Sequence, residues 1–547
     1  MTRHRSVRRH LPRSTRSGRA NLLVVLLLVG FSLIGVSVAL LSRGGPAVSV
    51  PGETLTMYAA AGMRIPVEQI ARQYEQEYGT RINLQYGGSN TLLNQLQVNT
   101  FDTTDLYLAA DDFYTDKAVE LGLARETLPI GHQRPVIAVR KDQTKSIASL
   151  TDLFREDVSV GVASPDQAAV GLAAKKMLET VSVDGTNRWA QLEAAVTSRG
   201  VFKPTVNDVA NDIKLGAVDA GIVWDTTAAM PQYRDELTAI AVPELEGDAD
   251  LVSLAVLSAS RQPTAALKFA RYLTARDKGL PVFAEFGMRP VEGDVWAETP
   301  QINFYCGAVN RRVVEGIVSD FQEREGVEIN TIYDGCGILT GRMKSIDRQL
   351  PELGFPDVYM ACDVYYLENV RDWFQEAANV SEVEIVIAVP KGSTKVRTSD
   401  DLIKPGVRVA IGQPEQCTIG ALTRRMLTDD GLYDKLMQKQ TQPGEVVVEK
   451  SSSALLVPDV VTGHVDAAIA YITDVLPNQD NVDIVRFASP LNRAVQPFSI
   501  ARSSEHKHLV RRLYRQVIAS PEAFASAGFH FRLAKESAAS KPEGGLP

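Results

Sequence analysis

Residues 55–96 read LTMYAAAGMRIPVEQIARQYEQEYGTRINLQYGGSNTLLNQL, and residues 302–343 repeat the same pattern as INFYCGAVNRRVVEGIVSDFQEREGVEINTIYDGCGILTGRM. In each stretch a short apolar run precedes an amphipathic segment, in which Ile65, Ile70 and Tyr74 recur at helical spacing. Strands that alternate with helices in this way form a mostly parallel sheet with helices on its faces. We therefore expect an α/β fold that binds its ligands where strands lead into helix N-termini.

The remainder of the chain repeats in the same order, at an offset of about 250 residues. Three further pairs of segments match: TDLYLAADDFY (104–114) with PDVYMACDVYY (356–366), VGVASPDQAAVGLAAKKML (160–178) with VAIGQPEQCTIGALTRRML (409–427), and LGAVDAGIVWDT (215–226) with TGHVDAAIAYIT (462–473). Chance does not give several matches in one order. We infer the duplication of a whole domain, with copy one at residues 53–297 and copy two at residues 300–530.

Composition limits the classes of protein that the chain can belong to. Its 547 residues exceed the roughly 250–300 residues that one hydrophobic core supports. The hydrophobic fraction of 45% and the charged fraction of 23% are typical of globular domains. The net charge of −8 includes an arginine-rich N-terminus, and the rest of the chain offers no basic patch, so we expect no binding to nucleic acid. The chain shows no Ser-His-Asp grouping and no phosphate-binding loop, so we expect no enzyme.

The N-terminus predicts a membrane anchor. Residues 21–41, NLLVVLLLVGFSLIGVSVALL, carry no charge, and about 20 such residues span a bilayer as a helix. Residues 1–20 contain arginines but no acid, and such a cluster stays in the cytoplasm. A cleaved signal peptide is the alternative, with a shorter apolar stretch and a small-x-small cleavage site. We expect a basic cytoplasmic tail (1–20), a single transmembrane helix (21–41) in the cytoplasmic membrane, a linker (42–52), an extracytoplasmic, periplasmic remainder and a flexible C-terminal tail (531–547).

The loop motifs identify a family. The segments YAAAG, GGSNTLLNQL, DLYLAADD, SPDQAAVGLAAKKML and AVDAGIVW resemble the successive ligand loops of the periplasmic molybdate-binding protein, a type II solute-binding protein of ABC transporters. The resemblance covers nearly all of both copies. It implies two tandem two-lobed periplasmic-binding-protein-like domains, a small oxyanion of the molybdate or tungstate type as ligand, and an ABC transporter permease as partner. Backbone amides and helix N-termini would hold such an anion without a full counter-charge.

The resemblance also implies site residues. Of the family's three hydroxyl positions, the first falls on Gly62 and Val309, the second on Ser89 and Gly337, and the third on Trp224 and Tyr471, so neither copy carries all three hydroxyls. Ser89 has an alternative role as a helix N-cap and Trp224 as a core aromatic. The predicted ligand-binding residues are Ala60, Ala61, Gly62, Ser89, Ala110, Ala168, Gly171, Trp224, Gly307, Gly337, Asp363 and Tyr471.

The only four cysteines, Cys306, Cys336, Cys362 and Cys417, all lie in copy two, each in a different predicted ligand loop. Our alignment of the copies places them opposite Ala59, Gly88, Ala110 and Ala168. Three interpretations stay open: disulfides, which are usual in exported proteins, a thiolate site for Zn²⁺, Cu(I) or an iron–sulfur cluster, and free thiols that line the cleft. In the resembled fold, Cys417 belongs to the lobe opposite the other three.

The sequence thus favours a membrane-anchored solute-binding protein. A second hypothesis is a sensor in which the four cysteines of copy two hold a soft metal ion or a redox cofactor. A third is a tethered scaffold in which copy one has become structural. The sequence predicts no cofactor apart from the soft metal ion of the second hypothesis.

Overall fold

The structure, a computed structural model, describes residues 53–98, 103–143, 145–183, 185–247, 250–346 and 354–533. Within these residues no helix is both long enough and apolar enough to cross a membrane. The predicted anchor at residues 21–41 lies outside the described part of the chain, as do residues 1–20, the linker 42–52 and all but the start of the tail 531–547.

Copy one consists of two α/β lobes. Lobe 1A is built on a sheet with the strand order β13-β4-β12-β3-β1-β2, and lobe 1B on a sheet with the order β11-β5-β10-β6-β9. The strands of lobe 1A are β1 (Thr54–Ala60), β2 (Arg81–Gly87), β3 (Leu106–Ala109), β4 (Ala124–Gln133), β12 (Asp250–Leu257) and β13 (Arg289–Pro290). Those of lobe 1B are β5 (Pro135–Arg140), β6 (Val160–Ala163), β9 (Val201–Lys203), β10 (Ala220–Trp224) and β11 (Leu237–Ile240).

Helices cover both sheets of copy one. Lobe 1A carries α2 (Arg64–Tyr78), α3 (Ser89–Val98), α4 (Asp112–Glu120), α9 (Pro263–Leu273) and α10 (Gly279–Glu285). Lobe 1B carries α5 (Ala169–Glu179), α6 (Arg188–Arg199), α7 (Val206–Lys214) and α8 (Asp225–Ala228), and a small ribbon pairs β7 (Ser182–Val183) with β8 (Thr186–Asn187). Because β1 pairs in parallel with both β2 and β3, the loops that follow these strands meet at one edge of the sheet.

Copy two repeats this plan with one change. Its strands form a continuous sheet, β15-β14-β16-β22-β17-β20-β18-β19, to which β21 and β23 add by pairing with β17. Strand β17 (Phe374–Pro390) is unbroken and pairs with β22 of lobe 2A and then with β20 and β21 of lobe 2B. In copy one the matching connection is divided at Arg134 into β4 and β5. Lobe 2A and lobe 2B therefore share one backbone strand.

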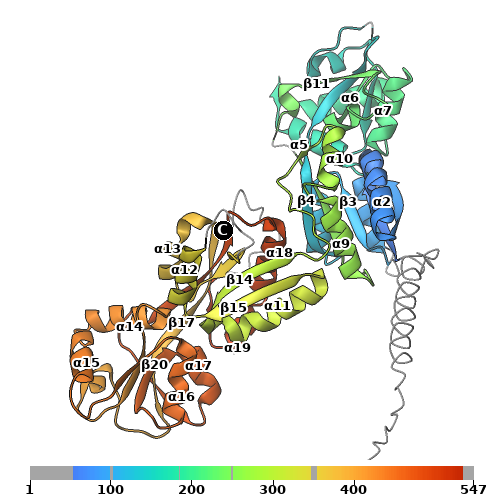
Figure 1. Ribbon diagram of the computed structural model, residues 1–547. Helices are drawn as coiled ribbons and strands as arrows, with labels where there is room; N and C mark the ends of the chain where they lie inside the picture. The colour runs from blue at the N-terminus through green and yellow to red at the C-terminus, as the bar shows by residue number, and fades with distance from the viewer. Residues whose placement is uncertain are drawn as a thin grey trace, which may run out of the picture. The chain divides into compact units, whose positions relative to one another are not determined.

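The elements of copy two lie as follows. Lobe 2A contains β14 (Gln301–Gly307), β15 (Glu328–Asp334), β16 (Val358–Met360), β22 (Arg493–Ala501), β23 (His530–Phe531), α11 (Arg311–Glu325), α12 (Cys336–Ser345), α13 (Val364–Glu368), α18 (Lys507–Ile518) and α19 (Pro521–Ser526). Lobe 2B contains β18 (Val409–Gly412), β19 (Val447–Lys450), β20 (Ala467–Tyr471), β21 (Val482–Arg486), α14 (Thr418–Asp429), α15 (Tyr433–Gln440), α16 (Leu456–Val461) and α17 (Ile472–Val475). In Figure 1 the four helices of lobe 2B surround β20.

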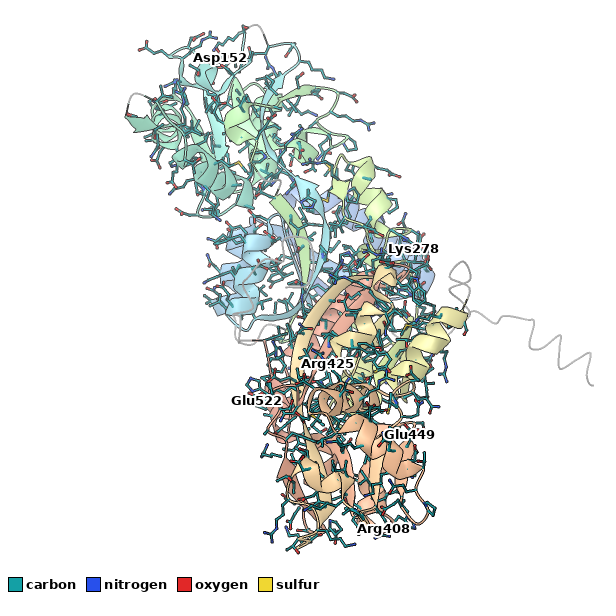
Figure 2. All side chains as sticks on the ribbon, turned by 90° about the vertical axis from the view of Figure 1, so that its left-hand side faces the viewer. Asp152, Lys278, Arg408, Arg425, Glu449 and Glu522 are labelled. Atoms are coloured by element: carbon teal, nitrogen blue, oxygen red, sulfur yellow. The ribbon has the colours of Figure 1, made fainter. Side chains whose placement is uncertain are left out.

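Equivalent residues end equivalent helices in the two copies. Helix α2 ends at Gly79, with φ of 72°, and α11 ends at Gly326, with φ of 65°. Both glycines adopt the left-handed conformation that closes a helix and that other residues rarely take. Charged residues such as Asp152 and Arg408, labelled in Figure 2, lie at the outer edges of lobes 1B and 2B, away from the buried sheets. The apolar residues of each copy form one core.

A buried ion cluster joins the two copies. Glu325 of α11, which is 1% exposed, accepts hydrogen bonds from Arg271 of α9 at 3.0 Å and from Arg512 of α18 at 2.6 Å. Burial by itself would raise the pKa of Glu325, but the two guanidinium groups hold that pKa below its ordinary value. The carboxylate is therefore ionised and shared between arginines of both copies.

Candidate functional site

The lobes of copy one meet at the loops that the sequence singled out. The amide of Asn90, in the first turn of α3, donates a hydrogen bond to the carbonyl of Gln167 in lobe 1B at 3.1 Å, and its side chain donates to the carbonyl of Asp166 at 2.7 Å. The side chain of Asn207 in lobe 1B donates to the carbonyl of Ala61 at 2.8 Å. The cleft between the lobes is therefore closed in this structure.

Gly62 faces the opposite lobe across this cleft. A Cβ atom at Gly62 would lie 3.2 Å from Val206 Cγ1, 3.5 Å from Thr227 Oγ1 and 4.0 Å from Trp224 Cδ1. The hydroxyl of Thr227 is buried, and among the described residues it has no hydrogen-bond partner. The structure thus brings the predicted residues Gly62 and Trp224 together and adds an unpaired hydroxyl beside them.

Ser89 stands at the start of α3 and is 1% exposed. Its hydroxyl accepts a hydrogen bond from the amide of Ala110 at 3.2 Å, and its carbonyl accepts one from Tyr107 at 2.7 Å. The hydroxyl therefore links two of the predicted ligand loops, the one that opens α3 and the one that follows β3. Ala60 and Ala110 are buried beside it.

Helix α5 begins at the cleft without a side-chain cap. Its N-cap residue is Ala168, which has no polar side chain to accept the first amides. The unsatisfied N–H groups at a helix N-terminus attract anions, as does the positive end of the helix dipole. Ala168 thus marks a helix N-terminus of lobe 1B that can attract an anion.

Two predicted ligand-binding residues, Gly171 and Asp363, also have structural roles. A Cβ atom at Gly171 would lie 2.1 Å from the carbonyl oxygen of Ala163, so this glycine allows α5 to pack closely on β6. Asp363 caps α13 by accepting from the amide of Tyr365 at 2.9 Å, and its second oxygen accepts from the amide of Val495 at 2.8 Å. Each oxygen of Asp363 accepts one backbone amide and can accept a further hydrogen bond, so its part in ligand binding stays a prediction.

The structure also corrects our alignment of the copies by one residue. Gly87 pairs with Ala60 as Asp334 pairs with Gly307, and α3 begins at Ser89 as α12 begins at Cys336. Cys336, not Gly337, therefore occupies the position of Ser89. A Cβ atom at Gly337 would lie 2.2 Å from the carbonyl oxygen of Glu415, so Gly337 permits the contact between lobes 2A and 2B.

The thiol of Cys336 repeats the role of the Ser89 hydroxyl. It accepts a hydrogen bond from the amide of Cys362 at 3.1 Å, and Cys362 is the equivalent of Ala110. The two sulfur atoms of Cys336 and Cys362 lie 3.0 Å apart, and both side chains are buried. We call these two residues the thiol pair.

The predicted four-cysteine metal site is not assembled. Among the described residues no three of the His, Cys, Asp and Glu side chains are placed to hold a metal ion, and the four cysteines are free thiols. Cys417 lies in lobe 2B facing Gly335, as predicted, but its sulfur turns to the carbonyls of Gln413 at 3.5 Å and Lys450 at 3.4 Å. The sulfur of Cys306 lies 3.8 Å from the carbonyl of Gly307. The sulfurs thus do not converge on one point.

The thiol pair shares its hydrogen bonds unequally. Burial alone would raise the pKa of Cys336, but the thiol and the amide of Cys362, together with the nearby Thr418 hydroxyl, hold that pKa below its ordinary value. The hydrogen bond to Cys336, followed by burial, raises the pKa of Cys362 well above its ordinary value. Cys336 is therefore the more acidic of the two thiols.

Comparison with known proteins shows the family of the chain. The model of the bacterial extracellular solute-binding protein family matches residues 55–289 and again residues 302–530. The chain belongs to this family. The chain is a tandem duplication of a domain that resembles the molybdate-binding protein. The members of the family are solute-binding proteins of the ABC transporter type.

Individual relatives are similar to this chain over a stretch about as long as one copy. The chain is 29% identical over 244 residues to a binding protein of Haemophilus influenzae, covering 45% of this chain and 94% of the relative. It is 25% identical over 256 residues to the molybdate-binding protein ModA of Mycobacterium tuberculosis, covering 46% and 91%. The solved periplasmic molybdate-binding protein of Azotobacter vinelandii is similar at 16% identity and a TM-score of 0.35, covering 43% of this chain and 98% of that one.

Several residues of this solute-binding protein's clefts were missed by the sequence analysis. Asn90 and Asn207 join the lobes of copy one, and Thr227 contributes a buried hydroxyl. In copy two, Thr418 follows Cys417 where copy one has Ala169 after Ala168. Comparison of the two copies position by position could have found Thr418, because its hydroxyl replaces the methyl group of Ala169 in a predicted ligand loop.

Asp474 of α17 occupies the position of Thr227, and its buried carboxyl makes stability depend on pH. Burial raises the pKa of Asp474 to about 6, against the lowering effects of Ser453 and the Arg312 charge. The native state therefore holds a proton that the unfolded chain releases near pH 4, so stability falls as pH rises from about 4 through 6. We expect Asp474→Asn to raise the free energy of unfolding at pH 7.5 by about 1–3 kcal/mol.

Urea denaturation of both chains from pH 4 to pH 8 measures this effect. The difference between Asp474→Asn and the parent chain should shrink towards zero at pH 4, where both side chains are neutral. The exposed Asp480→Asn is the matched control and should show no such trend. A constant difference at all pH values would contradict the prediction.

Proposed function

We propose that copy one captures a small oxyanion of the molybdate or tungstate type between its lobes and presents it to an ABC transporter permease. The observation that carries the proposal is the junction at Ser89, whose hydroxyl binds the Ala110 amide at 3.2 Å while the uncapped N-terminus of α5 faces it from lobe 1B. Oriented amides of this kind bind an anion without a counter-ion. The name of the mycobacterial relative supports molybdate as the ligand to test first.

Closure supplies the signal for delivery in this proposal. A ligand that contacts both lobes stabilises only the closed state, and its differential affinity for the two states sets how far the equilibrium moves. The direct contacts of Asn90 with Gln167 and of Asn207 with Ala61 support a stable closed state. A permease that recognises both lobes would then distinguish loaded from empty protein.

Calorimetric titration of the full chain with molybdate, tungstate, sulfate and phosphate tests the proposal. Ser89→Ala removes one hydrogen bond among several, so we expect affinity to fall by about 1 kcal/mol, or roughly fivefold. Ser198→Ala, on the outer helix α6, is the matched control and should bind as the parent does. If none of these oxyanions binds, or if both variants weaken binding equally, the site is assigned wrongly.

We also propose that residues 21–41 anchor the protein in the cytoplasmic membrane, with both copies outside. The absence of charge over 21 residues and the arginines before them support this orientation. The full chain should stay with membranes after alkaline carbonate extraction, and a reporter fused after Pro547 should be extracytoplasmic. Recovery of a soluble form that lacks residues 1–43 would contradict the anchor.

A further inference from the structure

The cleft of copy two carries different chemistry at the same positions. Cys336 replaces Ser89 and Cys362 replaces Ala110, yet the hydrogen bond between the two loops is kept, at 3.1 Å in place of 3.2 Å. Copy two therefore keeps the hydrogen bond between the ligand loops. It replaces the Ser89 hydroxyl and the Ala110 methyl group with two thiols. A ligand of copy two meets thiols where a ligand of copy one meets a hydroxyl.

The neighbouring residue is also changed, and the change makes room for the sulfurs. A Cβ atom at Gly307 would lie 2.3 Å from the sulfur of Cys362 and 2.9 Å from that of Cys336. Copy one has Ala60 at this position. An alanine side chain at position 307 of copy two would overlap the sulfurs of the thiol pair. Glycine at position 307 is thus required by the thiol pair, and the two features form one built site.

Hydroxyl groups surround the thiol pair. Thr418 replaces Ala169 at the start of α14, and its hydroxyl acts on both sulfurs. Tyr471 replaces Trp224, is fully buried, and has its pKa raised by burial and then by Cys362. Among the described residues, neither the Thr418 nor the Tyr471 hydroxyl has a hydrogen-bond partner of adequate geometry. Buried hydroxyls without partners are costly, so they point to a ligand that supplies one.

The electrostatics of this cleft suit an uncharged ligand. The interactions that set the pKa values of Cys336 and Cys362 come from thiols, hydroxyls and backbone amides rather than from cationic side chains. Asp474, at the Thr227 position, adds a carboxylate on the lobe 2B side, and that group is ionised above about pH 6. This carboxylate would repel an oxyanion but not an uncharged solute that carries hydroxyl groups.

The distance between the sulfurs limits the kind of centre that they can hold. Tetrahedral zinc with Zn–S bonds of about 2.3 Å needs its sulfurs roughly 3.8 Å apart and normally four protein ligands in a structural site. The thiol pair is 3.0 Å apart, and within the described residues no third ligand completes a metal site. A pyramidal trivalent centre, whose lone pair compresses the angle between its bonds, needs a smaller separation and only two thiols.

We propose that the thiol pair of copy two binds a trivalent metalloid hydroxide, of which arsenite, As(OH)₃, is the probe. Two S–H and two As–O bonds break, two As–S bonds form, and the two thiol protons leave with two hydroxides as water, so no electrons are transferred. The remaining As–OH group is the partner of the Thr418 and Tyr471 hydroxyls. The proposal rests on the proposed function only in that the lobes must open to admit a small solute.

Titration of the reduced full chain with arsenite, followed by native mass spectrometry, tests this assignment. We expect one arsenic per chain, bound with loss of two waters. Cys336→Ser and Cys362→Ser each leave arsenic with one As–S bond in place of two. Each substitution should therefore weaken binding by about a hundredfold. Cys417→Ser is the matched control, since its sulfur faces backbone carbonyls, and it should bind as the parent does.

A second measurement does not depend on the variants folding. In the parent chain, stoichiometric arsenite should protect Cys336 and Cys362 from alkylation by N-ethylmaleimide, whereas molybdate at the same concentration should leave their labelling unchanged. Failure of reduced protein to bind arsenite, or equal loss in Cys417→Ser, overturns the proposal.

The molybdate titration separates this failure from that of the proposed function. Ser89→Ala should weaken molybdate binding and leave arsenite binding unchanged, because Ser89 belongs to copy one. Arsenite binding without molybdate binding would overturn only the proposed function. Molybdate binding without arsenite binding would overturn only the present inference.

Discussion

Replacing Glu325 with alanine should lower the free energy of unfolding of the full chain by about 3–5 kcal/mol, because it leaves two buried guanidinium groups without their counter-charge. Glu325 is 1% exposed and receives hydrogen bonds from Arg271 at 3.0 Å and from Arg512 at 2.6 Å. Burial lowers the pKa of Arg271, and the Glu325 carboxylate opposes that shift. Unfolding in urea, followed by tryptophan fluorescence, measures the loss.

The same helix provides the control for this prediction. Glu323, two residues earlier in α11, is exposed, so Glu323→Ala should change stability by no more than about 0.5 kcal/mol. A loss below about 1 kcal/mol in Glu325→Ala would show that the arginines find other partners. Because the cluster joins α9 of copy one to α11 and α18 of copy two, we also expect the variant to unfold in two separate transitions.

Alanine at Gly88 should prevent closure of copy one and weaken oxyanion binding. A Cβ atom there would lie 2.3 Å from the carbonyl oxygen of Gln167 and 2.9 Å from that of Pro204, and both belong to the backbone of lobe 1B. Overpacking of this kind opposes the closed state by about 1–3 kcal/mol, so affinity should fall roughly 5–150-fold. Calorimetry with molybdate and small-angle scattering with saturating ligand measure the two effects.

Gly316→Ala is the matched control for closure. Gly316 lies within α11, and no atom outside its own helix lies within 4 Å of a Cβ atom placed there. It should therefore bind molybdate as the parent chain does and show the same compaction. If Gly88→Ala closes and binds normally, lobe 1A and lobe 1B do not approach as the structure has them.

The sequence predicted the fold well because the repeat supplied two independent views of each loop. The matched segments became β1 with α2 and β14 with α11, and both pairs end at equivalent glycines. The tandem two-lobed architecture was confirmed. The positions of Gly62, Ser89 and Trp224 at the cleft also followed, because loops after adjacent parallel strands converge at one edge of a sheet.

The site residues were predicted less well, for physical reasons. A one-residue error opposed Cys336 to Gly88, although the equal-length segments 55–96 and 302–343 already place Cys336 opposite Ser89. The starts of α3 and α12 at these residues agree with that position. The roles of Asp363 and Gly171 depend on which backbone groups lie beside them, and those groups are distant in sequence. The contact of Glu325 with Arg512 joins residues 187 positions apart, which no local pattern reveals.

The unbroken strand β17 gives the two copies different mechanical properties. In copy one the first crossing between the lobes is divided at Arg134, whose amide and carbonyl bond to Asp225, and the chain returns to lobe 1A between β11 and β12. Rotation about a few backbone bonds at Arg134 can help to separate the lobes. In copy two the same movement must bend a strand that pairs with β22 from Phe374 to Glu384 and with β20 and β21 from Ile385 to Pro390. A stiffer connection resists bending elastically and returns the lobes to one preferred angle. Copy two should therefore exchange its solute more slowly than copy one, and one chain would combine a fast and a slow binding site.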